Sequence, residues 1–235
     1  MSFTAPAGLS LRGISGPLRL ADYGLAAFDM DSTLIEIECV DEIAAAAGLK
    51  AEVAAITEAT MRGEIADFKE SLRRRVALLA GVSEAALHEI AAARLRLNPG
   101  VERFVEAARA AGLKTLLLSG GFTFFSERVA ARLHMDRARA NVLEIVDGRL
   151  TGRLVPQPWG DIVDGAEKRR ALLEMCAELG LPPARAIAVG DGANDLPMMG
   201  AAGLSIAFHA KPKVREQAMI SIEDGGMDRA LEILR

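Results

Sequence analysis

The chain has 235 residues, of which 51% are hydrophobic and 26% are charged, and its net charge at neutral pH is −4. This composition is sufficient for a packed core, and the absence of a basic block argues against nucleic acid as a partner. No run of 18 apolar residues occurs, so we expect neither a membrane span nor a membrane partner. The first 20 residues lack the apolar segment of a signal peptide. The only two cysteines, Cys39 and Cys176, are far apart and suggest free thiols, so we expect a cytoplasmic protein.

Five short apolar runs are typical of buried strands. They lie at residues 25–30, 114–119, 186–190, 204–208 and 218–222. Segments with helical periodicity separate them, at residues 101–111, 124–133 and 164–179. Strands that alternate with helices predict an α/β fold: a doubly wound, mostly parallel sheet with a Rossmann-like core.

Residues 38–97 interrupt this alternation. They are helical throughout, without a strand candidate, and glycines break them near positions 48, 63 and 81. We expect an inserted helical cap over the site. The core resumes at Asn98-Pro99-Gly100, where Asn98 is expected to cap a helix that begins with Pro99.

Residues 141–154 form the second exception. Asp147-Gly148 separates two strand-like halves there, which predicts a small β-hairpin flap. The expected organisation is a discontinuous catalytic core of residues 21–37 and 98–235, the helical cap of residues 38–97, and a short N-terminal arm of residues 1–20.

Two aspartates directly follow the first predicted strand. Asp29 and Asp31 are two positions apart, so on an extended chain their side chains point the same way. Two carboxylates this close repel each other unless a cation shares the site, and the arrangement suits divalent-metal phosphoryl chemistry. The alternative is a strand-end turn in which Asp31 and Ser32 only cap the next helix.

Ser119-Gly120-Gly121 follows another predicted strand. A small hydroxyl followed by two glycines lets backbone N–H groups approach an oxyanion closely, and the N-terminus of the next helix would add favourable charge. The alternative is a strand-to-helix turn that needs glycine for a positive φ.

A third motif, Gly190-Asp191-Gly192-Ala193-Asn194-Asp195, follows the predicted strand at residues 186–190. Mg²⁺ prefers oxygen ligands and takes one or two carboxylates in most protein sites, so Asp191 could complete a site with Asp29. Asp195 would orient these ligands. The alternative is an acidic turn, which is common beside glycine.

Lys168 lies at the opening of the predicted helix 164–179. A lysine there can donate to a phosphate oxygen and offset the charge of nearby aspartates. Most lysines on helix faces are solvated, as we expect for Arg169 and Arg170, so spacing alone does not single out Lys168. The three motifs nevertheless fall at the carboxyl ends of predicted strands, where ligands bind in parallel sheets.

Together these motifs, in this order, resemble the haloacid dehalogenase superfamily of aspartate-nucleophile phosphotransferases, and within it the family of phosphoserine phosphatases. The resemblance extends from about Ala21 onward. It is carried by residues 28–34, Glu38 with residues 41–44, residues 68–75, residues 119–122 and residues 190–195. Longer members have an N-terminal regulatory domain, for which residues 1–20 leave no room.

The resemblance implies a Mg²⁺-dependent phosphomonoesterase that converts O-phospho-L-serine to L-serine and phosphate, the last step of serine biosynthesis. In this family pattern Asp29 is the nucleophile that forms an aspartyl-phosphate, and Asp31 is the general acid and base. Mg²⁺ would be bound by Asp29, Asp191 and the main-chain carbonyl of Asp31. The phosphate oxygens would be held by Ser119, Gly120 and Lys168, with Asn194 nearby.

The family pattern also places Glu38 against the substrate ammonium group and Arg75 against its carboxylate. Arginine suits this role because its planar fork matches a carboxylate bidentately. However, Arg75 follows Arg73 and Arg74, and such a run is usually a solvated helix face. Phe68 would line the pocket, or simply belong to the core.

Three alternatives remain open at this point. The phosphoryl group could pass to an alcohol instead of water, the substrate could be another small phosphomonoester, or the fold could serve as a binding module without catalysis. In each case the partner is a small molecule, and we expect a monomer or a homodimer.

Overall fold

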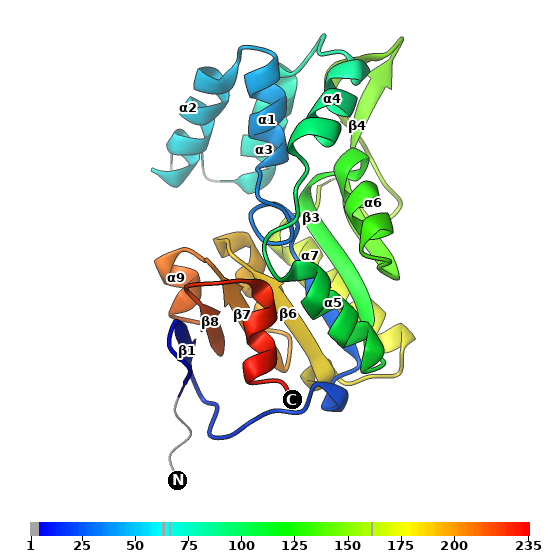
Figure 1. The fold of residues 1–235 in the computed structure, drawn as a ribbon. Helices are drawn as coiled ribbons and strands as arrows, with labels where there is room; N and C mark the ends of the chain where they lie inside the picture. Colours follow the sequence, from blue (N-terminus) through cyan, green and yellow to red (C-terminus); the bar gives the residue numbers. More distant parts are fainter. Residues whose placement is uncertain (1–4, 63, 66, 161) are drawn as a thin grey trace.

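The structure is a computed structural model that describes residues 5–62, 64–65, 67–160 and 162–235. Its centre is an eight-stranded sheet in the order β1-β8-β7-β6-β2-β3-β4-β5 (Figure 1). The six strands from β8 to β4 are parallel, whereas β1 and β5 pair antiparallel at the two edges. The predicted α/β fold with a mostly parallel sheet is therefore confirmed.

The strands are β1 (Leu9–Leu11), β2 (Leu25–Phe28), β3 (Lys114–Phe122), β4 (Arg137–Val146), β5 (Arg149–Val155), β6 (Ala186–Gly190), β7 (Leu204–Phe208) and β8 (Ile220–Ile222). Five of them, β2, β3, β6, β7 and β8, correspond to the predicted apolar runs, with differences at their ends. β3 continues three residues beyond the prediction because Phe122 pairs with Asn141 of β4 after a shift in register. β1 was not predicted, since its three residues form a strand only by pairing with β8.

The first four of the α-helices described between β2 and β3 gather at one end of the sheet (Figure 1). They are α1 (Cys39–Ala46), α2 (Lys50–Met61), α3 (Phe68–Leu78) and α4 (Glu84–Arg94). The predicted breaks near Gly48 and Gly81 fall between helices, and the break at Gly63 lies outside the described residues. The remaining helices are α5 (Val101–Ala110), α6 (Thr123–Arg132), α7 (Gly165–Glu178), α8 (Leu196–Met199) and α9 (Pro212–Arg215).

The hydrophobic core lies on both faces of the sheet. Side chains alternate along β2, so Phe28 packs in one cluster with Phe104 of α5, whereas Leu25 packs in the other with Leu172 of α7. All four residues of β2 are fully buried. A strand that is covered on both faces is a continuous apolar run in the sequence, which is why the sequence predicted β2.

The predicted hairpin is formed by β4 and β5. Its turn residues Asp147 and Gly148 both have positive φ, at 48° and 69°, as the tight hairpin turns require. The turn reaches the helices inserted after β2: the Gly81 N–H donates to the Leu150 carbonyl, and the Leu150 N–H donates to the Val82 carbonyl, both at 2.8 Å. The hairpin thus connects the sheet with the turn between α3 and α4.

Asn98 does not cap the next helix, so this expectation was wrong. α5 begins at Val101 with Gly100 as its N-cap residue, and Pro99 lies outside the helix. The Asn98 side chain instead donates to the carbonyls of Ser32, Thr33 and Ile35 at 3.0–3.2 Å. These carbonyls belong to the loop that follows β2.

We predict that Asn98→Ala lowers the free energy of unfolding by about 1–3 kcal/mol, because carbonyls of this loop lose their donor. Asn98→Asp should cost at least as much, because a carboxylate of the same shape would face carbonyl oxygens. Urea unfolding of both variants measures the change. A midpoint equal to that of the unchanged protein would contradict the role assigned to this side chain.

Candidate active site

Asp29 and Asp31 lie just beyond the end of β2 and line one cavity of about 1000 Å³. The Asp29 N–H donates to the Val189 carbonyl of β6 at 2.9 Å, so the backbone stays beside the sheet. The chain then turns at Ser32, whose φ is 58°. The cavity is also lined from the ends of β3 and β6, so the structure brings together the three motifs that the sequence singled out.

Asp191 comes from the loop after β6. One carboxylate oxygen each of Asp29, Asp191 and Asp195 lies within 4.8 Å of the others, which is a spacing that could hold a metal ion. Both oxygens of Asp195 already accept hydrogen bonds, one from Lys168 Nζ at 2.7 Å and the other from the backbone of Asp191 and Gly192. Asp29 and Asp191 are therefore the better ligands, and the donor set fits a hard divalent cation.

Lys168 is the buried cation of this site. Its side chain is fully buried, and its ammonium donates to both Asp29 and Asp195. Burial alone lowers the pKa of Lys168, but the two carboxylates outweigh it and raise the pKa above its usual value. Asp164 caps α7 by accepting from the Glu167 N–H at 2.8 Å, and this start places Lys168 in the first turn.

Asp29 is buried, with a side chain that is 7% exposed. Burial is the largest effect on its pKa and raises it, the Asp195 carboxylate raises it further, and Lys168 opposes both. A cation at this position favours the ionised form of Asp29, which is the form that can attack an electrophile.

Asp31 is held by a single residue of the next helix. The Cys39 backbone N–H donates to Asp31 Oδ2 at 3.1 Å, and the Cys39 thiol donates to Oδ1 at 3.3 Å. Burial, followed by the charge of Glu38, raises the pKa of Asp31 to about 7, although the bonds from Cys39 oppose this shift. A carboxyl group with this pKa can both give and accept a proton near neutral pH.

Ser119, Gly120 and Gly121 lie within β3 rather than in a separate turn. The helix α6 begins at Thr123, one residue before its predicted start. Close packing favours glycine at both positions: a Cβ on Gly121 would lie 3.1 Å from Asp31 Oδ2, and one on Gly120 would lie 3.1 Å from the Phe68 ring. The buried Ser119 hydroxyl accepts from the Gly121 N–H at 2.8 Å.

Arg75 faces the cavity and not the solvent. Arg73 and Arg74 are exposed, whereas Arg75 turns inward beside Phe68 and Ser71 on the same face of α3. Its Nε is buried and has no hydrogen-bond partner among the described residues. Burial lowers the pKa of Arg75, and nearby carboxylates, Asp41 first, partly offset this. A buried donor without a partner indicates a place for a ligand acceptor.

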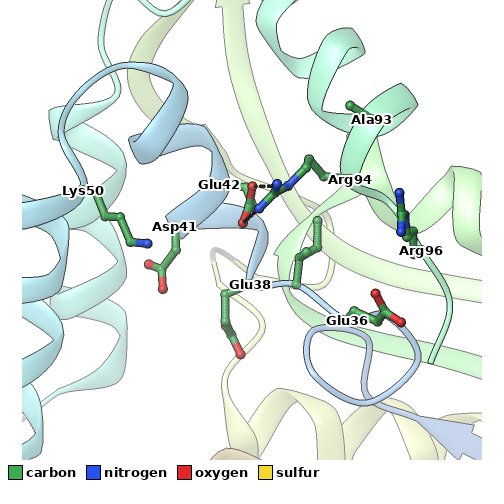
Figure 2. Close-up of a pocket in the computed structure, with 9 residues that line it drawn as sticks. Glu36, Glu38, Asp41, Glu42, Lys50, Ala93, Arg94 and Arg96 are labelled. Atoms are coloured by element: carbon green, nitrogen blue, oxygen red, sulfur yellow. Dashed lines mark hydrogen bonds and ion pairs between the residues drawn. The ribbon is translucent and has the colours of Figure 1, made fainter. Parts of the chain in front are cut away.

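Glu38 lies at the boundary between two cavities. It lines the cavity with Asp29 and Asp31, and also a second one of about 500 Å³ that is lined from α1, α2 and α4. Figure 2 shows this second cavity, where Arg94 pairs with Glu42 and charges of both signs line the wall. The exposed Glu38 carboxylate accepts from the Ser32 hydroxyl at 2.7 Å.

Several residues in or around the site were not singled out from the sequence. Thr33 donates to Asp191 Oδ1 at 3.1 Å, Cys39 holds Asp31, and Lys211 and Lys213 line the cavity from the segment after β7. Lys211 could have been found, because it follows the carboxyl end of a predicted parallel strand. The predicted residue Asn194 also lines the cavity.

Among the described residues, no helix has the length and apolar character needed to cross a membrane.

Comparison with known proteins agrees with this geometry. A family model of haloacid dehalogenase-like hydrolases matches residues 23–203. The chain is 65% identical to the phosphoserine phosphatase of Polaromonas sp., over 97% of both chains. It is also 65% identical to that of Albidiferax ferrireducens, over 97% of this chain and 96% of the relative. A solved phosphoserine phosphatase with an analogue of the phospho-aspartyl intermediate has a TM-score of 0.82 and 35% identity, covering 91% of this chain and 99% of that one.

The chain therefore belongs to the haloacid dehalogenase-like hydrolase family, and the resemblance seen in its motifs is confirmed. Within this family, the relatives that match it over nearly their whole length are phosphoserine phosphatases, so the chain is an enzyme of this group.

We predict that Lys168→Met lowers the free energy of unfolding by about 3–5 kcal/mol, because it leaves two buried carboxylates without their cation. Urea unfolding without added metal measures the effect. Arg132→Met is the control: this arginine pairs with Glu102 at 2.9 Å, but both side chains are more than half exposed. It should cost less than about 1 kcal/mol. Equal costs for the two variants would contradict the central role of Lys168.

Proposed function

We propose that this enzyme hydrolyses O-phospho-L-serine to L-serine and phosphate. One observation carries the proposal: the buried Arg75 Nε, without a partner among the described residues, lines the same cavity as Asp29. A phosphomonoester that reaches Asp29 and also bears a carboxylate would satisfy both groups. The names of the relatives with 65% identity support the same substrate.

In the proposed reaction Asp29 attacks phosphorus, the bond from phosphorus to the seryl oxygen breaks, and an aspartyl-phosphate forms. This divides one difficult displacement into two easier ones. Water then attacks phosphorus and releases phosphate and Asp29. The related structure with an analogue of a phospho-aspartyl intermediate supports this route.

Asp31 is the proposed general acid and base. It would protonate the seryl oxygen as this group leaves, and then accept a proton from the water that hydrolyses the intermediate. Its pKa of about 7 suits both steps. Cys39, which donates to both of its carboxylate oxygens, would hold the side chain in position.

The proposed cofactor is Mg²⁺, held by Asp29, Asp191 and the main-chain carbonyl of Asp31, with Asp195 orienting the site. When bound, a divalent cation neutralises charge on the transferring phosphoryl group. Asp195 remains engaged by Lys168 and by two backbone N–H groups. The side chain of Thr33 orients Asp191.

Phosphate and amino-acid groups would bind on opposite sides of the cavity. Ser119, Gly120, Lys168 and Asn194 would hold the phosphate oxygens on the core side. Glu38 would bind the ammonium group. Arg75, on the side of the inserted helices, would bind the carboxylate as a planar fork.

We further propose that residues 38–97 act as a cap domain over a core of residues 21–37 and 98–235. Phe68 of α3 packs against Gly120 of β3, which is one contact between the two parts. Closure of the cap would exclude water from the first step. The proposed setting is the last step of serine biosynthesis in the cytoplasm, where the buried thiols Cys39 and Cys176 would remain reduced.

We predict that Asp29→Asn abolishes phosphate release and leaves the fold intact, since the amide has the same shape but is a poor nucleophile. Phosphate release in the presence of Mg²⁺ measures activity, and circular dichroism checks the fold. Activity near that of the unchanged enzyme would refute Asp29 as the nucleophile.

The substrate is tested by phosphate release from L-phosphoserine, from phosphoethanolamine, which lacks the carboxylate, and from a phosphorylated hydroxy acid, which lacks the amine. We expect a strong preference for L-phosphoserine. Arg75→Ala should remove the advantage over phosphoethanolamine by raising KM, at a cost on the order of 2–4 kcal/mol. Arg74→Ala is the control, because Arg74 is exposed and pairs with Glu70 at 2.7 Å.

Other results of these measurements would contradict different parts of the proposal. Equal activity on all three compounds would retain the aspartyl-phosphate chemistry but contradict phosphoserine as the substrate. An equal loss on phosphoethanolamine in Arg75→Ala would contradict the role of this arginine. Activity that appears only with an alcohol acceptor would identify a phosphotransferase.

A further inference from the structure

The charges that line the active-site cavity are mostly negative. Among the described lining residues, the carboxylates are Asp29, Asp31, Glu38, Asp41, Asp164 and Asp191, and the cations are Arg75, Lys211 and Lys213. Lys168 and Asp195 lie buried beneath the floor and offset each other. A phosphomonoester that enters as a dianion therefore meets a repulsive field, which one bound divalent cation would only partly cancel.

Two of the three lining cations lie together on the core side. Lys211 and Lys213 belong to the segment that follows β7 and opens α9, which lies below α2 and α3 in Figure 1. Arg75 is on the opposite wall, in α3, and is largely buried. Lys211 and Lys213 are exposed, so their charges lie where the cavity meets the solvent.

The backbone that bears these lysines is fixed. The Lys211 N–H donates to the Asp191 carbonyl at 3.2 Å, and the Lys211 carbonyl accepts from Val214 and Arg215. Pro212 restricts the first turn of α9, and the neighbouring Val214 is fully buried. The segment is thus tied to the loop that bears the candidate metal ligand.

Among the residues that the structure describes, neither ammonium group takes part in an ion pair. No carboxylate of the described residues lies within 4.0 Å of either Nζ, whereas Lys114 and Lys168 both have such partners. A flexible ammonium on a fixed backbone position is suited to transient contact with an arriving anion, because it can follow the anion over several ångströms.

We propose that Lys211 and Lys213 form a cationic rim that draws the phosphate dianion into the cavity past its carboxylates. The rim raises the local concentration of the dianion and its rate of capture. It acts before the chemical step and therefore contributes to kcat/KM and not to kcat. The reaction it serves is the proposed one, but the rim recognises only the phosphate group.

The test compares Lys213→Gln, the double variant Lys211→Gln/Lys213→Gln and Lys114→Gln. Lys114 is the matched control because it is an exposed lysine in the first residue of β3, at the opposite end of the parallel sheet from the site. The substrate is p-nitrophenyl phosphate, which has neither ammonium nor carboxylate. Rates are measured with Mg²⁺ at ionic strengths of about 0.03 M and 1 M, where the Debye length is roughly 17 Å and 3 Å.

At low ionic strength we expect kcat/KM to fall several-fold in Lys213→Gln and on the order of tenfold in the double variant. The control should match the unchanged enzyme, kcat should stay constant, and the differences should disappear at high ionic strength. Calorimetric titration with inorganic phosphate should show the same order of affinities without turnover.

The proposal is overturned if Lys213→Gln matches Lys114→Gln at low ionic strength, if its defect persists at high ionic strength, or if kcat falls with kcat/KM. These outcomes are independent of the amino-acid part of the substrate. If the enzyme shows no preference for L-phosphoserine, phosphoserine is not its substrate. The measurements with p-nitrophenyl phosphate and inorganic phosphate still test the role of Lys211 and Lys213.

Discussion

The site depends on the buried ion pairs that Lys168 makes with Asp29 and Asp195. Three charges are removed from water here, which costs several kcal/mol per ion unless each has a partner. The three residues come from the end of β2, the first turn of α7 and the loop after β6, so these ion pairs hold together elements that are far apart in the sequence. Because both carboxylates share one cation, Asp29 and Asp195 cannot move independently, and the position of the candidate nucleophile is fixed by the core itself.

Around this centre, the parallel sheet determines which groups can meet. The carboxyl ends of β2, β3 and β6 lie side by side, so Asp29, Ser119 and Asp191 line one cavity. Close packing completes the arrangement, since a side chain on Gly121 would crowd Asp31 and one on Gly120 would crowd Phe68. Neutral side chains also set the chemistry: Cys39 holds Asp31, and Thr33 orients Asp191. The cation Lys168 is buried, whereas the carboxylates line the cavity. Exposed lysines at the rim would therefore help to attract an anionic substrate.

The helices inserted after β2 contribute a second kind of recognition. Their side of the cavity combines apolar residues such as Phe68 and Leu72 with Arg75, whose buried Nε has no hydrogen-bond partner among the described residues. This wall would distinguish substrates by the group attached to phosphate, whereas the core side would bind the phosphate itself. The hairpin turn is hydrogen-bonded to the segment between α3 and α4, so the insertion is connected to the sheet at a point far from Asp29 in sequence.

The sequence by itself determined the fold class, the family and the motif residues, because buried parallel strands are continuous apolar runs and because Asp29, Ser119 and Asp191 follow them directly. It also determined β6 and β7 to the residue. Only the tertiary structure decided which cations are buried. Arg73, Arg74 and Arg75 are identical in type and adjacent in the chain, and the orientation of α3 alone turns Arg75 inward. Similarly, Asn98 has the signature of a helix cap, but carbonyls from a distant loop compete for its side chain. Local sequence patterns indicate backbone preference and burial. The burial of Arg75 and the hydrogen bonds of Asn98 depend instead on which unsatisfied groups the fold brings close together.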